Sequence, residues 1–312
     1  MDVFKHTRHD FSSKRERNAV RIMELTRNQF DILTSLATGQ ENATVLSSET
    51  TAGLMRELTE LGYVQEGKIA KKGLDALEPY RAKRAIFIAA GLGSRLAPIT
   101  INTPKPLVRV HGTRIIDRLI DACLEAGIQE IYVVRGYLSE SFDQLLKKYP
   151  MIRFLENTLY REANNVSSAL LARRLLGNAY VFEADLLLSN PKIIRKYHYR
   201  SNFLAIKKDV TEDWCFEVKD GVIVEEKVGG RNCWQMVGIS YWNEKDGAML
   251  AEDVKEVFEM SGGKDRYWEQ VPLVDRKERY SVEVRECFDE DVVEIDTFRE
   301  LQAIDHAYDV SI

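Results

Sequence analysis

The sequence lacks any apolar run approaching the roughly 18 residues that a transmembrane helix needs. Its start, MDVFKHTRHDFSSKRERN, also lacks the apolar middle of a signal peptide. Cysteine is scarce: four are scattered along the chain, with no CxxC pair and no histidine at zinc-ligand spacing. Neither a disulfide framework nor a structural metal site is therefore expected. We expect a cytoplasmic protein with reduced thiols and no membrane partner.

A strong excess of basic charge is missing as well. The net charge is −5 at pH 7, and neither half of the chain has the basic excess of a strong nucleic-acid binder. With 45% hydrophobic residues, a chain of 312 residues can bury a substantial core. This length favours one large domain accompanied by a small one.

Residues 1–83 predict a small domain that resembles a winged helix. Two amphipathic helices are expected at 28–38 and 50–62, joined by a polar loop, and a strand pair follows over 63–73. A winged helix would offer the exposed face of its second helix to DNA.

The charge of that face argues against DNA binding. Arg56 stands among Glu57 and Glu60, whereas DNA phosphates favour clustered Lys and Arg. The strand pair could touch DNA weakly through three basic residues, Lys68, Lys71 and Lys72. We therefore favour a docking or homodimerisation role for this domain over nucleic-acid binding.

From Lys83 onward, apolar strands alternate with amphipathic helices. Strands are expected at 85–91, 131–137, 152–157 and 179–185, with helices between them at 115–127, 139–149 and 164–177. This alternation predicts an α/β fold over residues 84–312, with a Rossmann-like, mainly parallel sheet flanked by helices. Later in the chain, a hairpin is expected to turn at Asp220-Gly221.

The stretch FIAAGLGSRLAPITINTPKPL, residues 87–107, leads from a strand into a glycine-rich loop. Such a loop suits phosphate, because glycine lets the backbone approach the anion and present several N–H groups. The dinucleotide fingerprint is excluded because Leu96 stands where its third glycine would be, and a P-loop is excluded because no Gly-Lys-Ser/Thr follows Gly91. The remaining alternative is a plain strand-to-helix connection with incidental glycines.

The rest of this stretch makes the motif more specific. Gly91-Leu92-Gly93-Ser94-Arg95-Leu96 is followed by Pro98, Thr100 and Pro104-Lys105, a pattern that closely resembles the signature of the sugar-phosphate nucleotidyltransferase superfamily. Members of this superfamily join a nucleoside triphosphate to a phosphorylated small molecule and release pyrophosphate.

The resemblance implies roles for individual residues. Lys105 would stabilise the charge that develops on the α-phosphate, and Arg95 would hold the β- and γ-phosphates. Further nucleotide contacts are implied for the loop and for the start of the third helix, namely Ala90, Gly91, Gly93, Ser94, Asn164, Asn165 and Ser168. For Asn164, Asn165 and Ser168, at the start of the helix, the alternative is that the polar side chains cap the helix instead of binding a nucleotide.

Phosphoryl chemistry of this kind needs a divalent cation, and Mg²⁺ takes one or two carboxylates together with phosphate oxygens and water. Asp185 ends a predicted central strand, where open α/β sheets place such groups, and Asp296 follows VVEI late in the chain. Both match the superfamily's metal-binding aspartates, so Mg²⁺ is the expected cofactor. Asp185 could instead be an ordinary strand-end acid, and Asp296 the N-cap of the last helix. Glu183 points to the same side as Asp185 by strand alternation and could assist.

All four tryptophans fall between residues 214 and 268. Proteins hold a quaternary ammonium with aromatic faces and a nearby carboxylate. The segments KKDVTEDWCFEV, VGISYW, DRYWEQV and VVEID resemble those of bacterial CTP:phosphocholine cytidylyltransferases. That resemblance implies CTP and phosphocholine as substrates, and a phosphocholine site formed by Trp214, Tyr267, Glu269 and Glu294. The alternative is that the aromatic residues belong to the core, as expected for Trp242, while Trp234 stays undecided.

The sequence thus predicts a cytidylyltransferase that makes CDP-choline from CTP and phosphocholine. A second hypothesis is a nucleotidyltransferase that acts on a sugar phosphate or another phospho-alcohol. A third is a DNA-binding regulator whose nucleotidyltransferase-like domain only senses a nucleotide. The joint presence of Lys105, Asp185 and Asp296 argues against the third, because binding alone would not need all of them.

Overall fold

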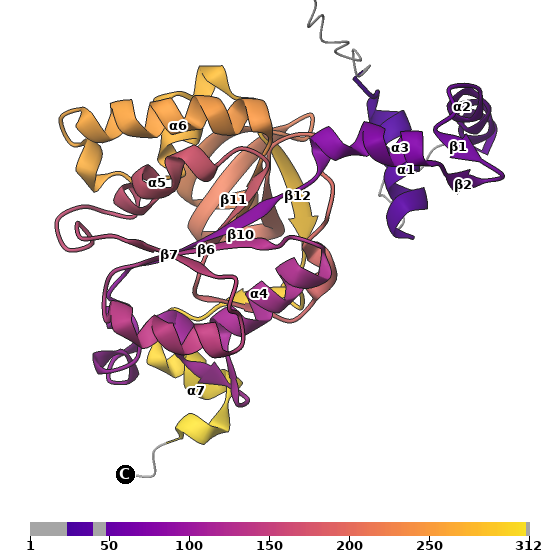
Figure 1. Ribbon diagram of the computed structural model, residues 1–312. Coiled ribbons are helices and arrows are strands. Elements are labelled where there is room, and N and C mark those ends of the chain that lie inside the picture. Colours follow the sequence, from indigo (N-terminus) through magenta and orange to yellow (C-terminus); the bar gives the residue numbers. More distant parts are fainter. Residues whose placement is uncertain (1–23, 40–47, 310–312) are drawn as a thin grey trace, which may run out of the picture. The chain divides into compact units, whose positions relative to one another are not determined.

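The computed structural model of the chain describes residues 24–39 and 48–309 (Figure 1). The chain divides into two compact units, Met1–Ala76 and Leu77–Ile312. Within the described ranges, none of the helices combines the length and apolar character that crossing a membrane requires.

The first unit contains two helices and a short hairpin, and a third helix begins near its end: α1 (Arg27–Thr38), α2 (Ser48–Glu60), β1 (Val64–Gln65), β2 (Lys68–Ile69) and α3 (Lys71–Leu77). Helix α1 begins at a capping box formed by Thr26 and Gln29, and it ends at Gly39, whose φ of 69° favours glycine. Residues 71–73, expected in the second strand, instead begin α3. The predicted polar loop lies outside the described residues, at 40–47, and the winged-helix likeness stays a prediction.

The second unit is built on a seven-stranded sheet with the order β10-β12-β11-β8-β3-β6-β7. Its strands are β3 (Arg84–Ala89), β6 (Glu130–Arg135), β7 (Arg153–Glu156), β8 (Ala179–Glu183), β10 (Asn202–Lys219), β11 (Val222–Trp242) and β12 (Glu283–Cys287). Strand β3 pairs in parallel with β6 and β8, and β6 pairs in parallel with β7, whereas β11 runs antiparallel to β8. Short pairs join β4 (Arg109–Val110) to β5 (Thr113–Arg114) and β9 (Leu186–Leu188) to β13 (Val292–Glu294). The expected mainly parallel sheet is confirmed.

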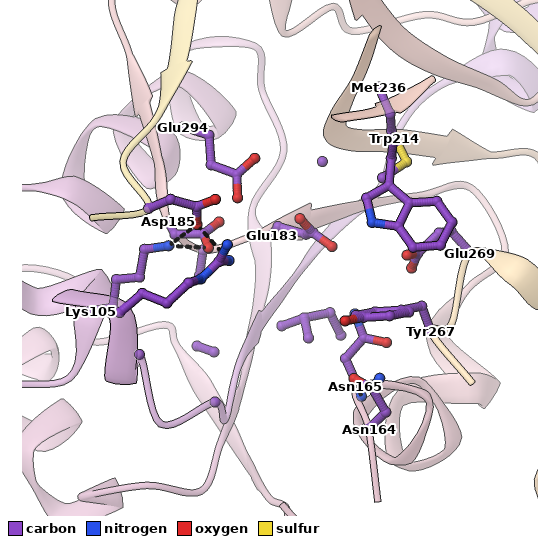
Figure 2. A pocket seen from close by; sticks show the side chains of 18 of the residues that line it. Lys105, Asn164, Asn165, Glu183, Asp185, Trp214, Met236, Tyr267, Glu269 and Glu294 are labelled. Carbon is purple, nitrogen blue, oxygen red and sulfur yellow. Dashed lines mark hydrogen bonds and ion pairs between the residues drawn. The ribbon is translucent and has the colours of Figure 1, made fainter. Parts of the chain in front are cut away.

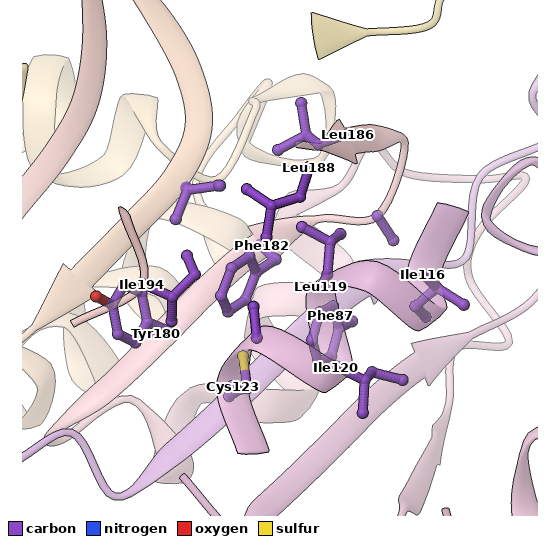
Figure 3. Close-up of a cluster of buried hydrophobic side chains, with 14 of the residues drawn as sticks. Phe87, Ile116, Leu119, Ile120, Cys123, Tyr180, Phe182, Leu186, Leu188 and Ile194 are labelled. Carbon is purple, nitrogen blue, oxygen red and sulfur yellow. The ribbon is translucent and has the colours of Figure 1, made fainter. Parts of the chain in front are cut away.

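Helices cover both faces of this sheet (Figure 1): α4 (Ile115–Glu125), α5 (Val166–Ala172), α6 (Glu244–Glu259) and α7 (Phe298–Ile304). Apolar side chains of α4 share a core with one face of the sheet, and those of α5 and α6 share a core with the other face. Figure 3 shows the first core, where the Phe87 and Phe182 rings stack with their centroids 4.8 Å apart. Helix α7 joins a smaller cluster with Leu96 and Val108, which lie in the chain that follows the glycine-rich loop.

The long β10–β11 hairpin turns at the predicted position. Asp220 and Gly221 have φ values of 52° and 81°, and left-handed values at both positions fit a tight two-residue hairpin turn. The segment VGISYW is the far end of β11. One difference lies at residues 139–149, where the predicted helix is a 3₁₀ helix over Ser139–Lys147.

We predict that Phe182→Ala lowers the free energy of unfolding by about 3–5 kcal/mol, because it removes a fully buried ring from the stacked pair. Phe288→Ala is the matched control: that ring is 53% exposed, so its loss should change stability by less than about 0.5 kcal/mol. Urea unfolding followed by circular dichroism measures both. Equal unfolding midpoints for the two variants would contradict the assignment of this core.

Candidate active site

A cleft of about 820 Å³ opens where β3 and β8 end. It is lined by the glycine-rich loop, by the chain that leads into α5, by the ends of β8 and β13, and by part of the β10–β11 hairpin. Open α/β sheets bind their ligands outside the carboxyl ends of their strands, so this is where the fold favours a site. Figure 2 shows the cleft with Lys105 at one end and Trp214 and Tyr267 at the other.

The glycine-rich loop lies folded against Lys105. Gly93 has a φ of 60°, and a Cβ at this position would lie 3.1 Å from the Cβ of Lys105. The Thr100 hydroxyl donates a hydrogen bond of 2.8 Å to the Gly93 carbonyl. Glycine is therefore needed at position 93 both for its backbone conformation and for the close approach of the lysine.

The ammonium of Lys105 lies between two carboxylates. Its Nζ is 2.8 Å from Asp185 Oδ2 and 3.0 Å from Asp296 Oδ1, and the residue is only 8% exposed. Arg95 reaches the same Asp296 oxygen with Nη2, at 2.8 Å. We call these four residues, Arg95, Lys105, Asp185 and Asp296, the ion cluster.

Two members of the ion cluster, Lys105 and Asp296, stabilise each other's charged forms. Burial lowers the pKa of Lys105, but the charge of Asp185 and hydrogen bonds to both aspartates outweigh it, so this pKa lies above its ordinary value. Burial also opposes the ionisation of Asp296, yet the hydrogen bond and charge of Lys105 hold the pKa of that carboxyl below its usual value. The cluster therefore presents two cations to an incoming anion.

A group of three carboxylates adjoins the ion cluster. Glu183, Asp185 and Glu294 offer oxygens that all lie within 4.8 Å of one another. Asp185 Oδ1 is buried and finds no hydrogen-bond partner among the described residues. Burial and the charges of Asp185 and Glu183 raise the pKa of Glu294, and burial, Glu269 and Asp185 raise that of Glu183 well above its ordinary value. Several carboxylate oxygens held this close together suit a hard cation such as Mg²⁺, which prefers oxygen ligands.

These positions differ in part from the sequence predictions. Of the two expected metal ligands, Asp185 is grouped with Glu183 and Glu294, whereas Asp296 contacts Lys105 and Arg95. Glu294, expected beside the choline group, lies near Asp185 (Figure 2). The alternative of Asp296 as an N-cap is wrong, because Thr297 caps α7.

Glycine at position 238 of β11 makes room for Glu183. A Cβ on Gly238 would lie 2.6 Å from Glu183 Oε2 and 2.7 Å from its Cγ, closer than real side chains approach. Strand β11 therefore packs directly on the Glu183 side chain and limits where that carboxylate can point.

The other end of the cleft is aromatic. The rings of Trp214 and Tyr267 meet edge to face, with centroids 5.6 Å apart and planes at 63°. Glu269 lies beside them in the cleft and is only 2% exposed (Figure 2). Trp242 is fully buried in the core, as expected. Trp234 is half-buried, with Lys207 Nζ 5.1 Å from its ring centroid, and does not line the cleft.

Two predicted nucleotide contacts lie outside the cleft lining. Ala90 is 3% exposed, and its carbonyl accepts the Tyr137 backbone N–H. Ser168 is 1% exposed, and its hydroxyl accepts a hydrogen bond of 2.9 Å from the Asn157 amide. The Ser168 side chain thus faces the interior, where it holds α5 to the chain that follows β7.

Asn164 and Asn165 do line the cleft, and neither caps α5 through its side chain. Asn165 stands at the N-cap position, but its Oδ1 accepts the Trp268 backbone N–H at 2.8 Å. Asn164 Oδ1 accepts the backbone N–H of Asn165. The start of α5 is thereby tied to the segment that carries Tyr267 and Glu269.

Sequence reasoning missed the cleft residues that the hairpin adds around Trp214, namely Glu212, Asp213, Val228, Gln235, Met236 and Gly238. No motif marks them, because antiparallel pairing of β10 with β11 brings them together. The one available signal was Gly238 inside a strand pattern, which indicates a close approach by another group.

Comparisons with known proteins agree with this geometry. Residues 84–213 match the family described as nucleotidyl transferase. A 2-aminoethylphosphonate cytidylyltransferase from Lancefieldella rimae is 37% identical over 228 residues, which cover 72% of this chain and 92% of that protein. A choline-phosphate cytidylyltransferase from Streptococcus pneumoniae is 31% identical over 229 residues, which cover 71% of this chain and 96% of that protein.

A solved structure extends the agreement to the fold. The CTP:phosphocholine cytidylyltransferase of Streptococcus pneumoniae superposes with a TM-score of 0.67 at 30% identity, covering 73% of this chain and all of that one. The resemblance inferred from the glycine-rich loop is therefore confirmed. The chain belongs to the nucleotidyl transferase family and, within it, to the cytidylyltransferases.

Proposed function

We propose that this chain is a Mg²⁺-dependent enzyme that transfers CMP from CTP to a small acceptor bearing a phosphate or phosphonate group and a cationic amino head. The observation that carries the proposal is the two-ended cleft. The ion cluster suits a triphosphate at one end, and Trp214, Tyr267 and Glu269 suit an organic cation at the other.

The reaction would be a single in-line displacement. An oxygen of the acceptor's phosphate or phosphonate attacks the α-phosphorus of CTP, and a new O–P bond forms. The bond from the α-phosphorus to its bridging oxygen breaks, and pyrophosphate leaves with that electron pair. Lys105 would stabilise charge on the α-phosphate oxygens, and Arg95 would hold the leaving phosphates.

The three-carboxylate group fits Mg²⁺, because Glu183, Asp185 and Glu294 converge where a buried Asp185 oxygen lacks a partner. When bound, Mg²⁺ supplies charge neutralisation for the triphosphate. Asp296, which contacts Lys105 and Arg95 in this structure, would be a further candidate ligand for the metal.

Two acceptors match the proposal. Phosphocholine is favoured by the edge-to-face pair of Trp214 and Tyr267, since aromatic faces attract a quaternary ammonium. 2-Aminoethylphosphonate is favoured by the relative of 37% identity that is a cytidylyltransferase for that compound.

Release of pyrophosphate tests the function directly. We expect release with CTP and phosphocholine, phosphoethanolamine or 2-aminoethylphosphonate, and much slower release with glucose 1-phosphate, which has no cationic head. Faster release with glucose 1-phosphate would refute the cationic acceptor but retain nucleotidyl transfer. Replacing CTP by ATP, GTP or UTP tests the base: equal rates with these nucleotides would contradict the cytidylyl assignment.

Lys105→Ala should lower kcat by about a hundredfold or more, because it removes a cation from the site of developing charge. Lys192→Ala, which alters an exposed lysine of the same unit, is the control and should keep full activity. Thermal melting of both proteins checks that they are folded. Near-normal turnover in folded Lys105→Ala would show that the lysine does not act at the α-phosphate.

Glu294→Gln should raise the Mg²⁺ concentration needed for half-maximal activity by roughly tenfold or more, because a charged oxygen donor is lost. Glu290→Gln, which changes an exposed acid nearby in the chain, should leave that concentration unchanged. Mn²⁺ binding measured by calorimetry gives a second readout. If Glu294→Gln instead raises the KM for the acceptor and leaves the metal dependence unaltered, Glu294 contributes to the acceptor site and not to the metal site.

A further inference from the structure

The acceptor end of the cleft holds carboxylate oxygens that lack a hydrogen-bond partner. Glu269 Oε2 is buried and unpartnered, although Glu269 lines the cleft beside Trp214 and Tyr267. Both carboxylate oxygens of Glu226, on β11, are also buried and unpartnered. Over residues 24–39 and 48–309, no Lys or Arg is found at ion-pair distance from either glutamate.

Glu226 does not line the cleft. It is two residues from Val228, which lines the cleft and pairs with Trp214, so Glu226 and Val228 share one face of β11. Burial and, more weakly, the charge of Glu226 raise the pKa of Glu269 to about 8, although hydrogen bonds from the Glu269 backbone and the Asn165 side chain oppose this rise. Burial and Asp275 likewise raise the pKa of Glu226 to about 7.

Asp275 does not provide the missing countercharge. One of its oxygens pairs with Arg266 at 2.9 Å, and the other is buried and has no partner among the described residues. Although the Asn165 side chain and the Glu269 backbone N–H donate hydrogen bonds to Glu269, buried carboxylate oxygens of Glu269, Glu226 and Asp275 still lack a donor among the described residues.

This imbalance distinguishes between two kinds of organic cation. A buried carboxylate oxygen without a donor is costly, and a ligand relieves that cost only if it brings N–H or O–H donors. A protonated primary amine has three N–H donors. A quaternary ammonium has none and is held by its diffuse charge against aromatic faces.

Building on the proposed function, we infer that Glu269 and Glu226 make the acceptor site selective for a protonated primary amine over a quaternary ammonium. Glu269 accepts N–H groups from the ammonium. Glu226 is a positioning residue that does not touch the acceptor: a cation bound at Glu269 favours the ionised form of both carboxyl groups, and the charge of Glu226 then strengthens the hold of Glu269 on the ammonium. The acceptor class is then an aminoethyl phosphonate or phosphate, with Trp214 and Tyr267 covering its carbon chain.

The test compares kcat/KM for 2-aminoethylphosphonate, phosphoethanolamine and phosphocholine at saturating CTP, in the wild-type chain, Glu226→Gln and Glu225→Gln. The wild type should prefer both primary amines over phosphocholine by about tenfold or more, since a charge-assisted hydrogen bond is available only to them. Glu226→Gln should reduce that preference several-fold through the acceptor KM, with the KM for CTP unchanged.

Glu225→Gln is the matched control, because Glu225 is exposed and lies one residue away on the opposite face of β11. It should leave the preference unaltered. The preference is the ratio of kcat/KM for a primary-amine acceptor to kcat/KM for phosphocholine. A general loss of active protein lowers both values equally, so a merely structural role for Glu226 would leave this ratio unchanged.

The outcomes separate this inference from the proposed function. Equal or better use of phosphocholine by the wild type, or an unchanged ratio in Glu226→Gln, would overturn the inference while cytidylyl transfer stands. Absence of pyrophosphate release with all three acceptors would instead overturn the proposed function.

Discussion

A buried ammonium held between two carboxylates organises the catalytic end of this protein. Lys105 follows the glycine-rich loop, Asp185 follows β8, and Asp296 follows β13, so three distant segments must meet for the ion cluster to form. Removing one partner would leave an uncompensated buried charge, which proteins tolerate poorly. Because Lys105 must be held between these carboxylates, the chain around it packs closely: Gly93 lies directly against Lys105 and Thr100, and Thr100 donates a hydrogen bond to the Gly93 carbonyl.

The acceptor end is built on a different principle. Its residues come from the antiparallel β10–β11 hairpin and from the chain that follows α6, rather than from the ends of parallel strands. The hydrogen bond from the Trp268 backbone to Asn165 links that chain to the start of α5. In the proposed function, the ends of the parallel strands therefore carry the residues for phosphate chemistry, and the hairpin contributes side chains that would select the acceptor.

Much of the fold and half of the site could be predicted from local patterns. The alternation of strands and helices, the turn at Asp220-Gly221 and the glycine-rich loop all depend on neighbouring residues, so they are visible in sequence. Lys105 was found because its spacing from the loop reflects direct packing against Gly93. The grouping of Glu183 with Glu294 was not predicted, because it depends on pairing of β9 with β13 across more than 100 residues of chain.

The sequence by itself determined the class of fold, the glycine-rich loop and the nucleotidyltransferase family, because these are marked by short motifs of neighbouring residues. Only the tertiary structure decided which carboxylates crowd together, that Ser168 faces inward, and that the carboxylate oxygens of Glu226 are buried without a partner. Those features depend on strand register and burial. A side chain's partners and solvent exposure become defined only when segments distant in sequence pack against one another.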